Sequence, residues 1–263
     1  MSKKIEDFII YTVIVLCFLA IPMAVAVHWI ADKVEKINMF SCEQAEDAAR
    51  EYLIKHHPDS DYEISSVDYA EKDVRCYVSI SSPTSQDSGF VLGYNNIGKL
   101  TYNSYERMVT KKGNVAVRLN SEYEAAVNAA FEPAAPWADF LCFGGLCWRT
   151  SSDSCAEPYD LVSDELVLDA SYNLAEISAR SGKIWLHVDV DSAEEVTVEN
   201  LADILLYVRQ TLDEEELPFY LLDVILDYHN GTSSKRLELE DFLYADIYEE
   251  EFSARLEKVV IQS

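Results

Sequence analysis

The residues best suited to chemistry lie on two stretches of alternating polarity, residues 183–190 and 219–229, which we predict to be β-strands. Alternation places the polar side chains of each strand on one face. Those side chains are His187, Asp189, Asp223, Asp227 and His229. If the two strands are neighbours, imidazole nitrogens and carboxylate oxygens converge, and these groups are ligands of divalent cations.

The resulting hypothesis is a weak divalent-cation site with the candidate ligands Asp189, Asp191, Asp227 and His229. The alternative is an exposed sheet face that carries ordinary polar residues. An EF-hand calcium loop that begins at Asp189 is excluded, because its sixth position requires glycine and Glu194 stands there.

Five of the six cysteines fall into three groups, and the sixth, Cys42, follows Ser41 at the start of a predicted helix. Cys17 lies in an apolar N-terminal run, and Cys76 alternates with valine and isoleucine, so we predict that it is a small buried hydrophobe. Cys142, Cys147 and Cys155 follow one another closely around a Gly-Gly pair. A disulfide among these three is one interpretation, and reduced thiols or a zinc site are the alternatives.

Sequence motifs of common enzymes are absent: the chain has no GxSxG, HExxH, P-loop or GxGxxG pattern. Whether the protein is an enzyme stays uncertain, and the sequence favours a non-catalytic role. It indicates no cofactor and no small-molecule substrate. We interpret the basic cluster around Arg107, Lys111 and Arg118 as a loop, and contact with the membrane surface or with an acidic partner is the alternative. We predict that Trp185 packs in the core.

The charge of the chain is strongly acidic, with a net value of −26. Residues 134–263 hold 8 basic and 28 acidic residues, a net charge of −20. Phosphate would be repelled, which excludes a simple nucleic-acid binder. A solvated surface explains most of this charge, and a protein partner with a basic surface is the binding alternative.

The 24 residues from Phe8 to Ala31 contain no acidic or basic side chain. As a helix they extend roughly 36 Å, enough to cross a hydrocarbon core of about 30 Å. We therefore predict a single transmembrane helix at Phe8–Ala31, after a short tail of residues 1–7; a cleaved signal peptide is the rival interpretation. The lysines of the tail favour a cytoplasmic N-terminus, which places the body outside the cytoplasm.

The rest of the chain contains the elements of two modest units. In the first, Ser41 and Gln44 form a capping box for a helix that ends before Pro58. Four strands follow at residues 62–70, 74–81, 89–94 and 99–102, and then a helix at 121–131 that begins after Asn120. In the second, we predict helices at 164–179, 198–212 and 247–259, with a hairpin of residues 219–229 and 235–242 around Asn230-Gly231.

The chain resembles a known family in several segments. These are AREYLIKHHPDSDYEISSVDY, RCYVSISS, GFVLGY, NIGKLTYNSY and NVAVRLNSEY, and later GKIWLHVDV and DFLYADIYEEEF. Their order is similar to the YfjL-like family, small membrane-anchored bacterial proteins with an N-terminal and a C-terminal α+β region. The resemblance covers nearly the whole chain. It implies anchoring and fold, and it implies no activity.

We therefore expect an α+β protein in which a transmembrane helix precedes two small domains with mainly antiparallel sheets. The expected domains are residues 40–133 and an acidic domain at 158–263, joined by a cysteine-containing linker at 134–157. The expected function is non-catalytic binding, as an accessory or sensory protein on the extracytoplasmic face of the cell membrane. The alternatives are an envelope hydrolase that uses carboxylates or a metal, and a scaffold tethered on the cytoplasmic side.

Overall fold

The computed structural model describes residues 40–131, 137, 139–151, 153, 157, 159–248, 252–259 and 261–262. These residues form two compact units, one that includes residues 40–81 and 91–103 and one that includes residues 82–90 and the described residues from 104 onward. Among the described residues, no helix is both long and apolar enough to cross a bilayer. The predicted anchor Phe8–Ala31 lies outside them.

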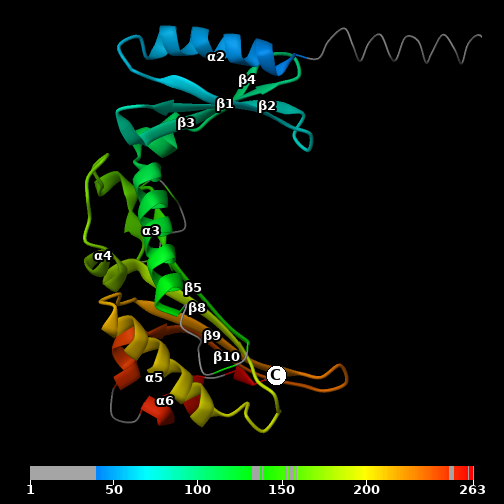
Figure 1. Ribbon diagram of the computed structural model, residues 1–263, viewed down its shortest axis with the longest axis vertical. Helices are drawn as coiled ribbons and strands as arrows, with labels where there is room; N and C mark the ends of the chain where they lie inside the picture. Colours follow the sequence, from blue (N-terminus) through cyan, green and yellow to red (C-terminus); the bar gives the residue numbers. More distant parts are fainter. Residues whose placement is uncertain are drawn as a thin grey trace, which may run out of the picture. The chain divides into compact units, whose positions relative to one another are not determined.

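The first unit combines helix α2 (Cys42–His56) with a sheet of four strands in the order β1-β2-β3-β4. The strands are β1 (Glu63–Ala70), β2 (Arg75–Ser82), β3 (Ser85–Asn95) and β4 (Leu100–Asn103). Strands β1 and β2 pair antiparallel, as do β3 and β4. Figure 1 shows α2 lying along this sheet. The four predicted strands are confirmed.

The capping box at the start of α2 is also confirmed. The Ser41 hydroxyl accepts a hydrogen bond from the backbone N–H of Gln44 at 3.2 Å, and the Ser41 N–H donates to the Gln44 side chain at 2.9 Å. Ala45, Ala49 and Leu53 then recur at four-residue spacing and are buried. This spacing turns one face of the helix inward throughout its length.

A disulfide joins Cys42, in the first turn of α2, to Cys76 on β2. Their Cα atoms are 5.4 Å apart, within the range that the bond requires. Cys76 is buried as predicted, but the prediction of a free hydrophobic side chain is wrong. The 34 residues between the partners hid the pair, because only the packing of α2 brings them together.

The second unit contains a sheet in the order β11-β10-β9-β8-β5. Its strands are β5 (Asp139–Leu146), β8 (Gly182–Asp189), β9 (Leu221–His229), β10 (Ser234–Leu243) and β11 (Ile261–Gln262). The β8–β9 pair is parallel and the other pairs are antiparallel. Helix α5 (Val198–Glu214) connects β8 to β9, and parallel neighbours need such a crossover. The mixed α+β class with mainly antiparallel sheets is confirmed.

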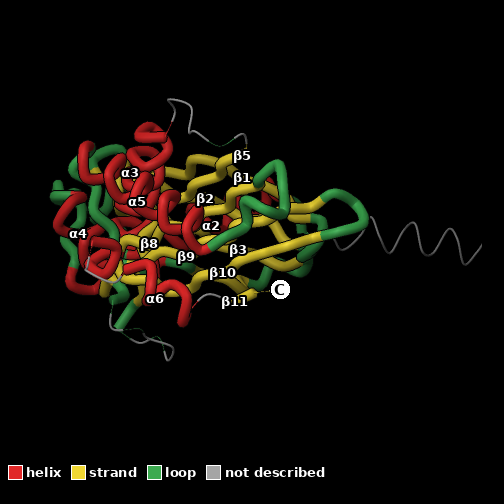
Figure 2. The backbone as a smooth tube through the Cα atoms, turned by 90° about the horizontal axis from the view of Figure 1, so that it is seen from below, coloured by secondary structure: helices red, strands yellow, loops and turns green. Residues whose placement is uncertain are grey.

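The helices of the second unit gather on one side of its strands (Figure 2). Helix α3 (Gly113–Phe131), α5 and α6 (Phe252–Val259) cover the sheet with apolar side chains. The buried cluster includes Leu119, Tyr123, Val127, Ile184, Leu186, Val188, Ile204, Leu205, Val224, Leu226, Leu239 and Leu256.

Helix α3 begins eight residues earlier than predicted. Val115 and Leu119 continue the buried four-residue spacing of Tyr123 and Val127 toward the N-terminus, so the helix does not start at Asn120. The Asn120 side chain instead accepts a hydrogen bond from the Leu146 N–H at 2.7 Å, which ties α3 to β5.

The predicted domain boundaries differ from the compact units. Helix α3 belongs to the second unit, and residues 139–146 are not linker but the edge strand β5. The contact is close: a Cβ added at Gly144 would lie 2.5 Å from a methyl carbon of Val127. The prolines at 133 and 136 therefore separate a helix from a strand, and not one domain from another.

Two other predicted helices are shorter than expected. In place of a helix at 164–179, the chain forms a 3-10 turn (Ser163–Glu165) and helix α4 (Leu174–Ser181), which Asn173 caps. Asp169 between them has a φ of +58°, a conformation that a helix cannot contain. The final helix is confined to α6, after a 3-10 segment at Tyr244–Tyr248.

Candidate functional site

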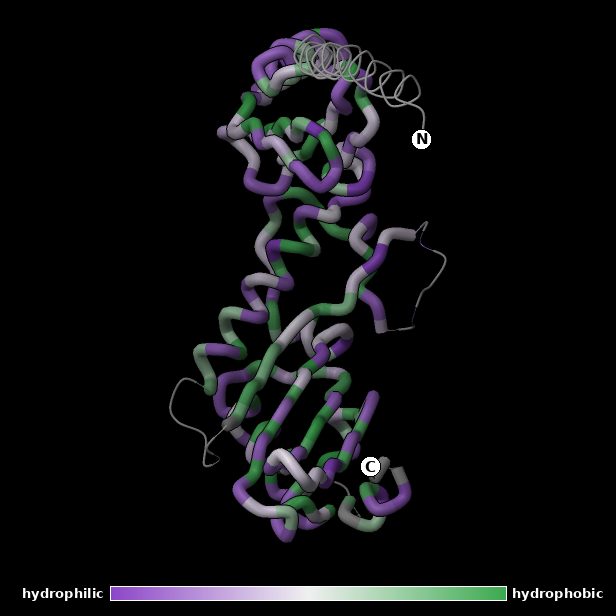
Figure 3. Tube along the Cα trace, turned by 90° about the vertical axis from the view of Figure 1, so that its right-hand side faces the viewer, coloured by the Kyte–Doolittle hydropathy of each residue, from purple (hydrophilic) through white to green (hydrophobic). Residues whose placement is uncertain are grey.

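One face of the second sheet is covered by helices, and the other is exposed. Along β8, Ile184, Leu186 and Val188 are buried, whereas Trp185 and Asp189 are exposed. The strands of this sheet alternate between hydrophobic and hydrophilic residues in Figure 3. We call the exposed side the open face. Strand register places on it Leu141, Phe143, Trp185, His187, Asp189, Asp223, Ile225, Asp227, Arg236 and Glu238.

An apolar cluster of Leu141, Phe143, Trp185 and Ile225 occupies part of the open face. Leu141, Phe143 and Trp185 expose 54%, 52% and 39% of their surface. Phe143 pairs directly with Trp185 across the strands, and Ile225 is the neighbour of His187. A cavity of about 230 Å³ beside them is lined by Phe143, Trp185, Leu186, His187, Asp223 and Ile225. Contiguous exposed apolar surface of this kind marks interaction sites.

The exposure of Trp185 corrects its predicted core position. The alternation that places His187 outside also places Trp185 outside, two residues earlier on the same strand. The alternation in the sequence therefore already indicated that Trp185 is exposed. Aromatic size alone favoured the core, but the helix-covered face is already filled by Ile184, Leu186 and Val188.

Lys183 organises the charges beside the apolar cluster. Its ammonium lies 2.8 Å from a carboxylate oxygen of Asp223 and 2.8 Å from one of Asp241, and 5.7 Å from the centre of the Trp185 ring. Burial alone would lower the pKa of Lys183, but the hydrogen bonds to both carboxylates raise it above its usual value. Asp223 therefore forms an ion pair with Lys183 and does not join the other polar side chains that were predicted to converge on a cation.

His187, Asp189 and Asp227 do converge. Asp189 and Asp227 are register partners on the parallel strands β8 and β9. One ligand atom from each of the three residues lies within 4.8 Å of the others, and His187 Nε2 is 3.3 Å from Asp189 Oδ1. The two other predicted candidates, Asp191 and His229, line a neighbouring cavity of about 460 Å³ together with Asp189, Val190, Tyr228 and Asn230.

The cysteines of the second unit are poorly suited to nucleophilic chemistry. Cys142 and Cys147 are free, and Cys155 lies outside the described residues. Burial raises the pKa of the Cys142 thiol to about 12. Burial also raises the pKa of Cys147, and the nearby Asp160 adds to the effect. Both thiols stay protonated near neutral pH, whereas nucleophiles and metal ligands are thiolates. A disulfide that involves Cys155 stays a prediction.

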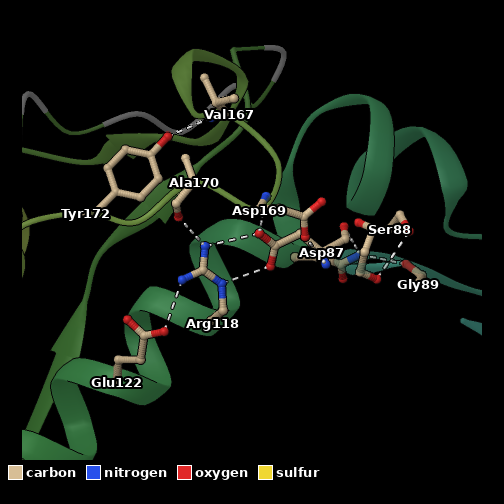
Figure 4. A network of polar contacts seen from close by, with 11 residues as sticks. Asp87, Ser88, Gly89, Arg118, Glu122, Val167, Asp169, Ala170 and Tyr172 are labelled. Carbon is tan, nitrogen blue, oxygen red and sulfur yellow. Dashed lines mark hydrogen bonds and ion pairs between the residues drawn. The ribbon is translucent and has the colours of Figure 1, made fainter. Parts of the chain in front are cut away.

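Arg118 is a structural residue and does not lie in a basic loop. It projects from α3 and forms two hydrogen bonds of 2.9 and 3.0 Å with Asp87, whose side chain is only 1% exposed (Figure 4). It also donates to Glu122 and to the Ala170 carbonyl, and the Asp169 N–H donates to Asp87. The hydrogen bonds to Asp87 raise the pKa of Arg118, which keeps the guanidinium charged.

Comparison with known proteins identifies a family through the second unit of the chain. A solved structure of a DUF5037 family protein from Ruminococcus gnavus ATCC 29149 is similar at 13% identity. That similarity covers 82% of this chain and 89% of the other, with a TM-score of 0.23. No curated protein matches the chain. The model of the YfjL-like C-terminal domain matches residues 122–257, from the middle of α3 into α6. The match covers more than half of the chain, which therefore belongs to the family of proteins with a YfjL-like C-terminal domain.

Proposed function

We propose that this chain is a single-pass membrane protein whose body, outside the cytoplasm, binds a partner protein with a basic surface. The observation that carries the proposal is the open face, where exposed aromatic side chains lie among carboxylates. In this proposal the protein acts as an accessory or sensory component of the cell surface and performs no chemical step.

The location is supported by two features. The apolar run Phe8–Ala31 is long enough to span a bilayer, and Lys3 and Lys4 precede it. The Cys42–Cys76 disulfide supports the orientation, because disulfides persist in oxidising compartments and are rare in the cytosol.

The binding role is supported by the anatomy of the open face. Protein interfaces combine an apolar, aromatic centre with a polar rim, and tryptophan often contributes most of their binding energy. Phe143 and Trp185 provide such a centre. Among the described side chains around them are five carboxylates, Asp189, Asp223, Asp227, Glu238 and Asp241, and two cations, Lys183 and Arg236. Charge complementarity therefore favours a partner that presents basic side chains around an apolar anchor.

The test of binding is photocrosslinking in intact cells. A photoreactive amino acid replaces Phe143, or Val167 as the matched control, which is exposed but lies outside the sheet. We expect an adduct with one other protein at position 143 only. Once identified and purified, that protein should bind the full-length chain, more weakly at high salt and more weakly to the Trp185→Ser variant.

Three outcomes would refute this binding role: the same adducts at both positions, an adduct with a second copy of this chain, or binding that Trp185→Ser leaves unchanged. Protease treatment of intact cells tests the location. Protection of the body would overturn the extracytoplasmic orientation and favour the cytoplasm-facing scaffold. Hydrolysis by the purified chain that depends on Asp189 or Asp227 would favour the envelope hydrolase.

A further inference from the structure

We infer that His187, Asp189 and Asp227 form a binding site for a divalent transition-metal ion such as Zn²⁺ or Mn²⁺. This inference does not rest on the proposed partner protein. It rests on the three side chains that the β8–β9 register brings to one point of the open face.

The geometry of the three ligands fits one small ion. Bonds of about 2.0 to 2.2 Å from zinc to nitrogen or oxygen place neighbouring ligand atoms of a tetrahedral site roughly 3.3 to 3.6 Å apart. His187 Nε2 and Asp189 Oδ1 already have this separation, at 3.3 Å, and the full set lies within 4.8 Å. The Asp189 side chain is 52% exposed, so it is free to rotate by the small amount that closes the set.

The environment of His187 points to a cation. Its Nε2 atom is shielded from solvent and has no hydrogen bond of good geometry among the described residues, although it faces the Asp189 carboxylate. A metal ion bound at this nitrogen would give it a partner and would lie beside the Asp189 carboxylate, which would be a second ligand.

The surrounding charges leave the two carboxylates available. Arg236, the cross-strand neighbour of Asp227, pairs with Glu238 at 2.9 Å. Lys183 pairs with Asp223 and Asp241 farther along the sheet. The open cavity beside Asp189 provides room for water molecules that would complete the coordination. The imidazole favours a transition-metal ion, because Ca²⁺ and Mg²⁺ prefer oxygen ligands.

The experiment uses the full-length chain in mild detergent, with a purification tag that lacks histidine and cysteine. Mn²⁺ binding is followed by electron paramagnetic resonance, because this ion has little preference for the free thiols. Zn²⁺ binding is measured by calorimetry. We expect the original chain to bind one Mn²⁺. The affinity should be lower by about tenfold or more in His187→Gln and in Asp227→Asn. The matched control is Asp203→Asn, which removes an exposed carboxylate from α5 and should bind as the original chain does.

The inference is overturned if the original chain binds no stoichiometric Mn²⁺ or Zn²⁺ at millimolar concentration, or if both ligand variants bind as tightly as the control. The first result would identify the cluster as ordinary polar residues of an exposed sheet face. Circular dichroism confirms that each variant is folded, and Asp189→Asn provides a third variant at the most exposed ligand. Ion binding that persists while photocrosslinking at Phe143 fails would refute the partner and leave the metal site standing.

Discussion

The Cys42–Cys76 disulfide should contribute a large share of the stability of the first unit. The perturbation is a double variant, Cys42→Ser with Cys76→Ala, because the second site is buried and a hydroxyl there would lack a partner. The bond closes a loop with a sequence separation of 34. The loop entropy that it removes from the unfolded chain corresponds to about 4 kcal/mol at 25 °C.

Hydrogen exchange followed by mass spectrometry measures this effect on the full-length chain. A loss of about 4 kcal/mol should accelerate exchange of the most protected amides in α2 and β2 by roughly a thousandfold. Amides of β8 and β9 provide an internal control, since they belong to the second unit. The variant Cys147→Ser removes a free thiol and should change neither unit.

Two results would refute this reasoning. If exchange in β2 is unchanged, the bond does not restrain the unfolded first unit. If β2 and β8 accelerate equally, the two units do not open independently, and the loop calculation cannot be applied to one of them. In cell extracts under denaturing conditions, the bond should keep both cysteines from alkylation until a reductant is added, whereas the cysteines of a cytoplasmic body should be alkylated without a reductant.

Other perturbations test the second unit. Arg118→Met leaves the Asp87 carboxylate buried without its main partner, and we expect a loss of about 3 to 5 kcal/mol in thermal unfolding. The double variant R118M/D87L should recover much of this loss, and a variant as unstable as R118M would contradict the assignment. Gly144→Ala forces a methyl group to within 2.5 Å of Val127, so denaturant unfolding should show a loss of about 1 to 3 kcal/mol that Val127→Ala partly relieves. Because burial raises the pKa of Cys142 to about 12, its thiol is protonated at pH 8, and iodoacetamide should label it only after unfolding. Rapid labelling of the folded chain would show that this thiol is accessible.

Local patterns in the sequence predicted the elements well. Alternation identified β2, β8 and β9, and it placed His187, Asp189 and Asp227 on matching faces before their pairing was known. The capping box marked the start of α2 correctly. These features depend on residues within a few positions of one another, where side-chain direction follows directly from backbone period.

Relations between distant residues could not be predicted in the same way. The partner of Cys76 is 34 residues away, and nothing near it distinguishes a bonded cysteine from a buried free one. The parallel β8–β9 pairing follows from the way α5 packs. The sequence alone therefore could not show that Asp223 pairs with Lys183 and does not join the cluster of His187, Asp189 and Asp227. The pair of prolines after α3 indicated a break, but only packing against β5 shows that both sides belong to one unit.

The assignment of residues 82–90 to the second unit has a practical consequence for protein production. This segment carries Asp87, yet it is enclosed in the sequence by residues of the first unit. A single cut after residue 103 would therefore give a C-terminal fragment in which Arg118 has lost its buried carboxylate. A fragment made to the boundaries of the family match, residues 122–257, would lose both partners and the first half of α3. A continuous stretch of this chain that contains the whole second unit must therefore also contain residues 91–103 of the first.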